Sequence, residues 1–470
     1  MRGTGAILAT LIAYNIMLVG VGLWARGRNR DVTDFFLGGR RLGPWVAAIS
    51  ASASSSSAWT LLGVSGAAYA WGLPALWLFP ATVGGFLINW AWVAPRLQRL
   101  ANAEGAVTLS AVLAPATLGD SRRLILRIAA LIIVFCFVFY IASQFEAAGK
   151  AFESVFGLAK ANSILLGAAI VLAYTLLGGF WAVSVTDTVQ GLLMLAAAIV
   201  LPAVALAAIG GPAALIDGLR VAGWSGTAED PAMFAGVTGL FFILGFFGIT
   251  INYPGQPHVV NRYMALRDAP SLRQGRLIAL SWAVLVYAGM LTLGLCARLL
   301  TPGLEDVEQV LFKVTATLLP AVLAGIVLAA VLSAVMSTAD SQLLVAASAI
   351  SHDWNLAGGQ AVTGLLRSRV TVVVVLVLST LLALLWRADI FSRVLFAWAA
   401  LGAAFGPILL LRLSGRALSA RGTLAAMLSG FLLTVLISGW LATPGDVAGR
   451  VLPFLAALVI AFRSSTPQPR

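Results

Sequence analysis

The sequence predicts an all-α polytopic membrane protein with about 13 transmembrane helices, and three observations lead to this fold class. First, 60% of the 470 residues are hydrophobic and only 10% are charged, whereas about a quarter of the residues in a typical soluble domain are charged. Second, the apolar residues form runs of about 20, which is the length of a helix that spans a bilayer. Third, the charged residues gather in short clusters between these runs.

Thirteen apolar segments are expected to form the helices. They cover residues 4–24, 42–70, 74–95, 124–149, 162–184, 186–209, 233–257, 276–299, 316–350, 369–387, 391–412, 422–441 and 450–463. The first is interpreted as a helix and not as a cleavable signal peptide, because no small-residue cleavage site with a mature domain follows it. The longest outer loop, about Gly210–Ala232, is too short to fold as a domain. We therefore expect a single transmembrane domain over residues 1–470.

The basic residues predict how these helices are oriented. With the N-terminus outside and the C-terminus in the cytoplasm, 21 of the 30 Lys and Arg residues, Arg262 among them, lie on the cytoplasmic side, as the positive-inside rule requires. Acidic pairs such as Glu229–Asp230 then lie outside. The net charge of +12 is explained by this distribution. It forms no basic stripe on a soluble face, so nucleic-acid binding is not expected.

Two of the expected helices contain sequences that interrupt a helix. Ala51–Ala58 has five serines within six residues, and serine hydroxyls compete for backbone hydrogen bonds. Gly248–Pro257 has two prolines, two glycines and an Asn, which remove donors and lower helix propensity. Irregular backbone at membrane depth is tolerated only where protein surrounds it or where it lines a polar cavity.

The spacing of the two breaks predicts an internal repeat. They lie five helices apart, which indicates an inverted repeat that pairs helices two to six with helices seven to eleven, and a binding site between the breaks. A serine-rich interface between helices is the alternative for the first break, since small residues also allow close helix packing.

Acidic residues inside the expected helices need partners, because a charge at the bilayer centre costs about 3 kcal/mol on insertion scales. Glu146 is followed four residues later by Lys150, so we expect a helical ion pair between them. Asp187 opens the sixth helix. Asp340 lies deep in the ninth, with no basic residue one turn away, which makes it a candidate for binding a cation or a proton.

The residues around Asp340 strengthen the prediction of a cation site. Ser337, Asp340 and Ser341 share one helix face, since Asp340 and Ser341 follow Ser337 by three and four residues. Hydroxyl and carboxylate oxygens are the ligands that hard cations prefer. Carbonyl oxygens freed by the break between Ala53 and Ser57 could complete the coordination shell.

Other residues that can carry chemistry have plainer interpretations. Cys136 and Cys296 fall inside apolar segments and are expected to be buried small hydrophobic residues. For His258, at the expected inner mouth, a structural hydrogen bond is favoured over proton transfer. No metalloprotease or serine-hydrolase motif is present, so the chain is not expected to be an enzyme.

Several motifs together resemble the sodium:solute symporter family, and most closely its sodium/proline symporter branch. They run almost end to end: Gly38–Trp45, Ala53–Trp59, Gly178–Gln190, Gly255–His258, Arg262–Ala265, Ala334–Thr338, Gln342–Leu344, Phe396–Trp398 and Gly402–Pro407. The resemblance implies a LeuT-type fold of 5+5 helices with alternating access, and core repeats at approximately 42–209 and 233–412. It also implies a location in the cell (inner) membrane.

The resemblance also implies a set of site residues. The sodium ligands are the carbonyl oxygens of Ala53, Ser56 and Ala334 and the hydroxyls of Ser337 and Thr338. A second cation position, used in some members, maps to Asp187, Asp340 and Ser341. Substrate contacts map to Ser57, Trp59, Tyr140, Gln144, Tyr253 and Gln256. Arg40 matches an arginine that matters for sodium-coupled transport in the proline branch.

Two departures from the proline branch bear on the site. Ser55 stands where that branch has an aspartate, and Ile249 stands where it has a tryptophan four residues before the Tyr253 position. The first departure bears on the affinity for sodium, and the second bears on whether proline is the transported solute. Asp340 stands where close relatives often have a small or hydroxyl residue. We hypothesise that Asp340 supplies the negative charge that is missing at Ser55.

The sequence thus predicts a secondary active transporter that couples Na⁺, as the co-transported ion, to uptake of a small solute, L-proline first. Proton-coupled transport, or sodium-coupled transport of another small amino acid or carboxylate, is the alternative. A transporter-like membrane sensor is an alternative of another class. The expected partners are the solute and the lipid bilayer; no nucleic acid and no obligatory protein partner are inferred.

Overall fold

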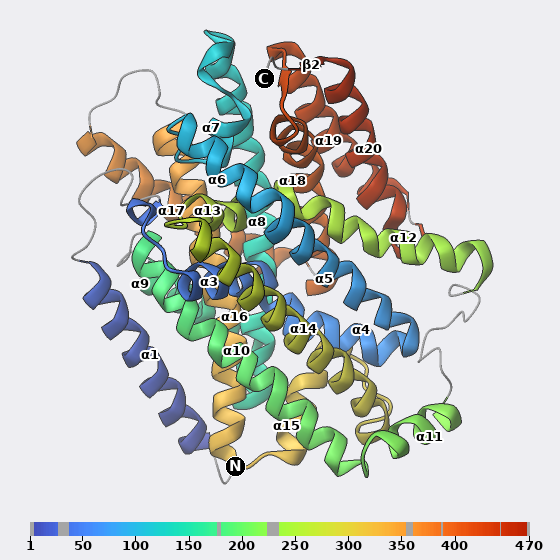
Figure 1. Cartoon of the computed structure of the whole chain (residues 1–470). Helices are drawn as coiled ribbons and strands as arrows, with labels where there is room; N and C mark the ends of the chain where they lie inside the picture. Colours follow the sequence, from blue (N-terminus) through green and yellow to red (C-terminus); the bar gives the residue numbers. More distant parts are fainter. Residues whose placement is uncertain are drawn as a thin grey trace.

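The structure is a computed structural model, and it describes residues 4–26, 37–175, 180–222, 235–353, 361–386, 389–441 and 443–467. Nearly all of them are helical (Figure 1). The first half contains α1 (Thr4–Arg26), η1 (Gly38–Arg40), α3 (Pro44–Ala58), η2 (Trp59–Gly63), α4 (Val64–Trp71), η3 (Leu73–Trp77), α5 (Leu78–Ile88), η4 (Asn89–Val93), α6 (Ala94–Ala103), α7 (Leu109–Leu113), η5 (Ala116–Leu118), α8 (Ser121–Phe156), α9 (Lys160–Thr175), α10 (Phe180–Ala208) and α11 (Pro212–Ala222).

The second half has the same character. It contains α12 (Gly236–Asn252), η7 (Tyr253–Gly255), α13 (Pro257–Met264), α14 (Ala269–Leu300), η8 (Val307–Gln309), α15 (Val310–Leu318), α16 (Ala321–Ser348), η9 (Ala349–Asp353), α17 (Ala361–Leu385), α18 (Ile390–Leu413), α19 (Ala420–Trp440), η10 (Pro444–Asp446) and α20 (Val447–Arg463). Two short strands, β1 (Arg416–Leu418) and β2 (Ser465–Pro467), pair antiparallel beyond α18 and α20.

A helix lies at each of the thirteen predicted apolar segments. Within the described residues, nine helices are long and apolar enough to cross a membrane, and two shorter apolar helices lie at Lys160–Leu172 and Arg369–Leu385. The all-helical membrane fold is therefore confirmed, whereas the number of thirteen spans stays a prediction. Both cysteines are buried, as expected.

Three boundaries differ from the prediction. The long segment 316–350 is divided, because α15 ends at Leu318 and α16 starts after Pro320, which is fixed in an extended conformation. The expected outer loop 210–232 contains a helix, α11. Residues 180–184, assigned to the fifth helix, belong to α10, so Asp187 lies in the second turn of its helix and does not open it.

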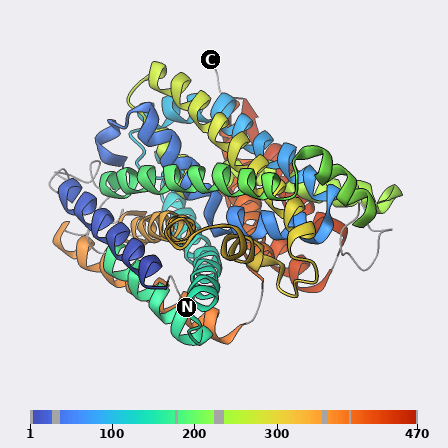
Figure 2. The same ribbon diagram turned by 90° about the horizontal axis from the view of Figure 1, so that it is seen from below.

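The helices pack around α3, α8, α10, α16 and α18, which supply the site described below. α16 contacts α3, α8, α10 and α1, and α18 contacts α8, α12, α19 and α20. Figure 2, a view from below, shows α8 and α16 nearly end-on beside each other. α1 lies at the edge of the bundle against α16 and α10 (Figure 1). The residues around both predicted breaks are buried.

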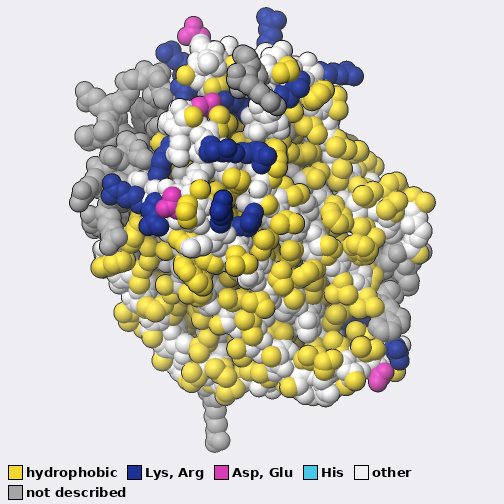
Figure 3. All heavy atoms as spheres, viewed as in Figure 1, with side chains coloured by type: hydrophobic (Ala, Val, Ile, Leu, Met, Phe, Trp, Pro, Cys, Tyr) yellow, Lys and Arg dark blue, Asp and Glu magenta, His cyan; other side chains and the backbone are white. Residues whose placement is uncertain are grey.

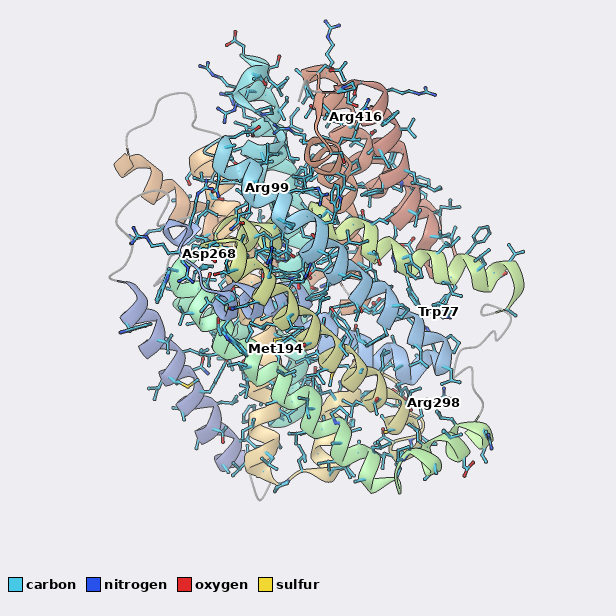
Figure 4. All side chains as sticks on the ribbon, viewed as in Figure 1. Trp77, Arg99, Met194, Asp268, Arg298 and Arg416 are labelled. Carbon is cyan, nitrogen blue, oxygen red and sulfur yellow. The ribbon has the colours of Figure 1, made fainter. Side chains whose placement is uncertain are left out.

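The surface separates a basic end from an apolar flank. Lys and Arg side chains gather at the upper end in Figure 3, and the flank below is mainly hydrophobic. The C-terminus is marked at that upper end in Figure 1, which has the same orientation. The marked N-terminus lies at the lower end in Figure 1. Arg99 and Arg416 lie toward the basic end, and Arg298 lies toward the opposite end (Figure 4). Glu229 and Asp230, predicted to be outside, fall outside the described residues.

Candidate functional site

The predicted break in the serine-rich helix is present at Ser57. Its backbone has φ 31° and ψ −177°, outside the helical region and strained for a residue with a side chain. Side chains satisfy the backbone that the break frees: the Ala58 N–H donates to the Gln144 Oε1 at 3.1 Å, and the Trp59 N–H donates to the Ser57 Oγ at 3.1 Å. Chain direction therefore changes beside α8, which carries Gln144.

The predicted sodium ligands come together where α16 crosses α3 just before this break. The Thr338 hydroxyl donates to the Ser54 carbonyl oxygen at 3.1 Å. The Ser337 hydroxyl lies 3.5 Å from the Ala53 carbonyl oxygen and 3.4 Å from the Ala334 carbonyl oxygen. Oxygens that bind one cation at about 2.4 Å and at right angles are ~3.4 Å apart. The distances from the Ser337 hydroxyl to the Ala53 and Ala334 carbonyl oxygens are thus compatible with a shared cation.

The fifth predicted ligand, Ser56, belongs to the same segment of α3. Its carbonyl oxygen accepts from the Trp59 N–H, and its hydroxyl lies 3.4 Å from the Tyr287 hydroxyl on α14. α10 can approach α3 here because Gly191 has no side chain: a Cβ on it would lie 3.0 Å from the Ala53 Cβ. A carbonyl has a second lone pair, so the Ser56 carbonyl can still bind a cation.

Two of the three residues predicted for a second cation, Asp187 and Ser341, contact an arginine that the sequence reasoning counted as cytoplasmic. Arg262 on α13 is 1% exposed, and its guanidinium pairs with Asp187 Oδ2 at 2.9 Å. It also donates to Ser50 at 3.0 Å and to Ser341. Ser50 donates to the same Asp187 oxygen at 2.7 Å. Arg262 thus joins α3, α10, α13 and α16 at one point.

Asp340 has no such partner. Its side chain is fully buried, and neither carboxylate oxygen has a hydrogen-bond partner among the described residues. Asp187 Oδ1 is also buried without a partner there. One guanidinium faces two carboxylates, so the group has one uncompensated negative charge when both acids are ionised. Such a group favours a further cation.

The predicted substrate residues on α3 and α8 lie together at the break. The Tyr140 hydroxyl is 3.5 Å from the Ser57 Oγ, and the Gln144 amide nitrogen donates to Ser143 at 3.0 Å while its oxygen caps the break. Trp59, 4% exposed, packs its ring against Tyr287 and Phe391 at centroid distances of 6.4 and 5.5 Å.

The second predicted break supplies the other substrate residues. α12 ends at Asn252, Gln256 is extended, and α13 starts at Pro257. The Tyr253 hydroxyl donates to the Ser55 Oγ at 3.0 Å, which joins the two breaks directly. The Gln256 amide nitrogen donates to the Asn252 and Trp398 carbonyl oxygens, and its Oε1 is buried with no partner among the described residues.

Arg40 lies away from these groups, at the entry to α3. It adopts φ 56° after two glycines, Gly38 and Gly39, that also have positive φ. Its guanidinium donates to the carbonyl oxygens of Ala101 and Ala106 and to Asn102 at the end of α6. Partial burial lowers the pKa of the guanidinium. Arg40 thus connects the start of one helix to the end of another and does not contact the sodium ligands.

The ion pair predicted between Glu146 and Lys150 is wrong. Lys150 instead pairs with Asp306 at 2.7 Å and Glu308 at 2.8 Å, and Glu146 pairs with Lys160 at 2.5 Å. Partners from the neighbouring loop and helix replace the weak pairing within α8 because the ends of these elements meet there. Burial raises the pKa of the Glu308 carboxyl, although Lys150 opposes this effect.

Sequence reasoning missed three further groups. Tyr287 contacts Ser56 and Thr60 through its hydroxyl, yet in the sequence it is one aromatic residue in an apolar helix. Arg262 was placed outside the membrane. The structural hydrogen bond predicted for His258 is not found, because neither ring nitrogen has a partner among the described residues. The motif Gly255–His258 was the only sequence signal for that side chain.

Comparison with known proteins identifies the family. Residues 35–430 match the model of the sodium:solute symporter family. The chain belongs to the sodium:solute symporter family. Its membership places it among transporters and not among enzymes.

Curated relatives of this symporter match over nearly their whole length. The osmoregulated proline transporter OpuE of Bacillus subtilis (strain 168) is 34% identical, with 98% of this chain and 95% of that protein covered. The sodium/proline symporter of Staphylococcus aureus (strain JH9) is 32% identical, with coverage of 96% and 91%.

Solved structures confirm the LeuT-type fold of this symporter. A sodium-coupled sialic acid symporter in a substrate-bound outward-open state matches with a TM-score of 0.81 at 18% identity, and 99% of each chain is covered. MhsT in complex with L-phenylalanine matches with a TM-score of 0.56 at 14% identity, covering 90% of this chain and 98% of that one. At these identities the likeness concerns the fold alone.

Proposed function

We propose that this symporter couples Na⁺ to the uptake of a small solute, L-proline first, by alternating access. The family and the two curated relatives named for proline support the substrate class. The observation that carries the coupling is the meeting of Ser337 and Thr338 with the carbonyl oxygens of Ala53 and Ser54. A cation bound there contacts α3 and α16 together.

Such a site can couple ion binding to conformation for a physical reason. A ligand shifts an equilibrium between two states only by its difference in affinity for them. When α3 and α16 move apart, the hydroxyls and the carbonyls that share the cation separate, and the cation loses ligands. Sodium therefore favours the arrangement in which Ala53, Ser56, Ala334, Ser337 and Thr338 are together, and its release favours the other arrangement.

The substrate residues border the same break. Ser57, Tyr140 and Gln144 surround the point where α3 unwinds, and Tyr253 reaches Ser55 from the second break. Half-helix ends present oriented dipoles that suit the charged groups of an amino acid. The Gln256 Oε1 has no partner within the described part of the chain and is an acceptor for a substrate N–H. Trp59 adds an apolar aromatic surface next to these polar groups.

We assign a second cation position to Asp187, Asp340 and Ser341. Arg262 neutralises only one of the two carboxylates, and three buried carboxylate oxygens lack partners among the described residues. Sodium is the first candidate for this position. Proton coupling, the alternative, is a direct outcome of the transport experiment below.

The protein is proposed to lie in the cell (inner) membrane with its N-terminus outside and its C-terminus in the cytoplasm. Support comes from the surface: the basic side chains gather at the end where the C-terminus lies (Figure 3), and basic residues face the cytoplasm in membrane proteins. The solute and the bilayer are the partners that this role requires.

The test is uptake of radiolabelled L-proline by the purified protein in liposomes, with an imposed sodium gradient and no pH gradient. The expected result is uptake that requires sodium and is competed by excess unlabelled L-proline. Sodium-dependent uptake of other solutes but not of proline would mean that another solute is the substrate. Ile249 would then be the first residue to replace. Uptake that starts only when a proton gradient is applied would overturn sodium coupling.

A further inference from the structure

His258 lies among the side chains proposed to bind the solute. Its ring is fully buried, with centroids 5.9 Å from Tyr140 and 6.4 Å from Trp398. Tyr140 approaches Ser57 at the first break, and the Trp398 ring packs on Tyr253 at 5.1 Å. The imidazole therefore connects the two halves of the proposed substrate site, a role that the sequence did not predict.

The imidazole has hydrogen-bonding capacity that the described residues do not use. A neutral imidazole carries one N–H donor and one nitrogen acceptor. Neither nitrogen of His258 has a partner among the described residues. Buried polar groups in native proteins are nearly always satisfied by protein, water or a ligand. In a symporter, the solute is a ligand that reaches such a buried position.

The local charge favours an anionic group of the solute. His258 is the second residue of α13, so the positive end of the helix dipole lies beside it. Pro257, the first residue, has no N–H, and the side chain of His258 adds a donor at this end. Two residues earlier, the Gln256 Oε1, which has no partner among the described residues, provides an acceptor. A donor at a positive helix end beside an acceptor matches the carboxylate and the ammonium of a zwitterion.

We propose that the ring N–H of His258 binds the carboxylate of the transported amino acid. The inference rests on the proposed function and deepens it, because it requires the solute to carry a carboxylate. The arginine in the same short helix, Arg262, is already paired with Asp187. His258 thus determines specificity through a neutral donor and not through a full charge.

The test compares two variants with the wild type in the sodium-driven liposome assay. His258→Phe keeps an aromatic ring of similar size and removes both nitrogens; His258→Gln keeps an amide N–H. For each protein, uptake is competed with unlabelled L-proline and with L-prolinamide, which lacks the carboxylate. Because a hydrogen bond to a charged group is at stake, His258→Phe is expected to weaken apparent L-proline affinity by roughly 10- to 100-fold. His258→Gln is expected to retain most of it.

The ratio of the apparent affinities for L-proline and L-prolinamide distinguishes a direct contact from a packing effect. In the wild type L-proline should compete far better than L-prolinamide, and in His258→Phe this preference should shrink to about threefold or less. The sodium concentration for half-maximal uptake should stay within about twofold, since His258 is not among the sodium ligands. A sodium-dependent rise in the thermal unfolding midpoint, kept in His258→Phe, would show that the variant is folded.

Two results would overturn the inference. One is unchanged L-proline affinity in His258→Phe. The other is an equal loss of affinity for L-proline and L-prolinamide, which would make His258 a packing residue. A wild-type protein that takes up no L-proline under a sodium gradient would instead overturn the proposed function, and the wild-type arm alone reveals that.

Discussion

The Thr338 hydroxyl lies 3.1 Å from the Ser54 carbonyl oxygen, three residues before α3 leaves the helical conformation at Ser57. Its neighbour Ser337 lies 3.5 Å from the preceding carbonyl, that of Ala53. Two consecutive hydroxyls on α16 thus face two consecutive carbonyls on α3. Because of this register, an ion bound at the α16 hydroxyls also contacts the α3 carbonyls just before the break. Its affinity therefore depends on the position of the break relative to α16.

Removing these hydroxyls is expected to weaken sodium binding and to leave the contacts with the solute in place. Ser337→Ala and Thr338→Val each delete one oxygen ligand of about 1–3 kcal/mol, which corresponds to a rise of roughly 5- to 150-fold in the sodium concentration for half-maximal uptake. Ser348→Ala is the matched control, because its hydroxyl donates to the Val345 carbonyl within α16. Unchanged sodium dependence in both variants would remove Ser337 and Thr338 from the site.

Moving one negative charge tests whether Asp340 compensates for Ser55. Asp340→Ser alone should abolish or strongly weaken sodium coupling, since it removes a buried carboxylate with no partner among the described residues. The double variant Ser55→Asp with Asp340→Ser should recover sodium-dependent uptake, because the charge again lies near the ions. A double variant that is folded but inactive, while Ser55→Asp alone is active, would contradict this compensation.

The sequence predicted the parts of the site that depend on local chain chemistry. Both breaks were found from their serines, prolines and glycines, because these residues disturb a helix wherever it lies. Ser337 and Asp340 were found because their spacing puts them on one helix face. The contacts across helices were not predictable in the same way, since a single sequence gives no depth or facing direction.

Arg262 and Lys150 illustrate this limit. Arg262 follows a break and looks like the first residue of a cytoplasmic cluster, yet α13 restarts within the protein and keeps it buried beside Asp187. Lys150 has an acid four residues earlier, which predicts a helical pair. The loop before α15 brings two carboxylates to it instead. Tyr287 was overlooked because a buried aromatic residue in an apolar helix is normally core.

Loss of the Arg262 guanidinium is expected to destabilise the protein strongly. Arg262→Met leaves Asp187 buried without its cation, at a cost on the order of 3–5 kcal/mol. The double variant Arg262→Met with Asp187→Asn removes both charges and should recover most of the thermal unfolding midpoint in detergent. A double variant no more stable than Arg262→Met would mean that the guanidinium acts through Ser50 and Ser341 and not through the ion pair. Sodium-dependent uptake should stay impaired in this double variant, even where its stability is recovered.

At the other end of the bundle, two lysines that look alike in the sequence should differ in their contribution to stability. The Lys150 side chain is 11% exposed and pairs with both Asp306 and Glu308, whereas the Lys160 side chain is 40% exposed and, among the described residues, pairs with Glu146 alone. Lys150→Met leaves the buried Glu308 without its cationic partner. The second carboxylate oxygen of Glu308 accepts from the Phe391 N–H at the start of α18.

We therefore expect Lys150→Met to cost on the order of 3–5 kcal/mol and Lys160→Met to cost less. In Lys160→Met, Glu146 still faces the positive charge of Arg393. Thermal unfolding midpoints in detergent measure both effects, and Lys150→Met with Glu308→Gln should be more stable than Lys150→Met alone. Equal midpoints for the two single variants would show that the loop pairs of Lys150 do not hold α8 to α18.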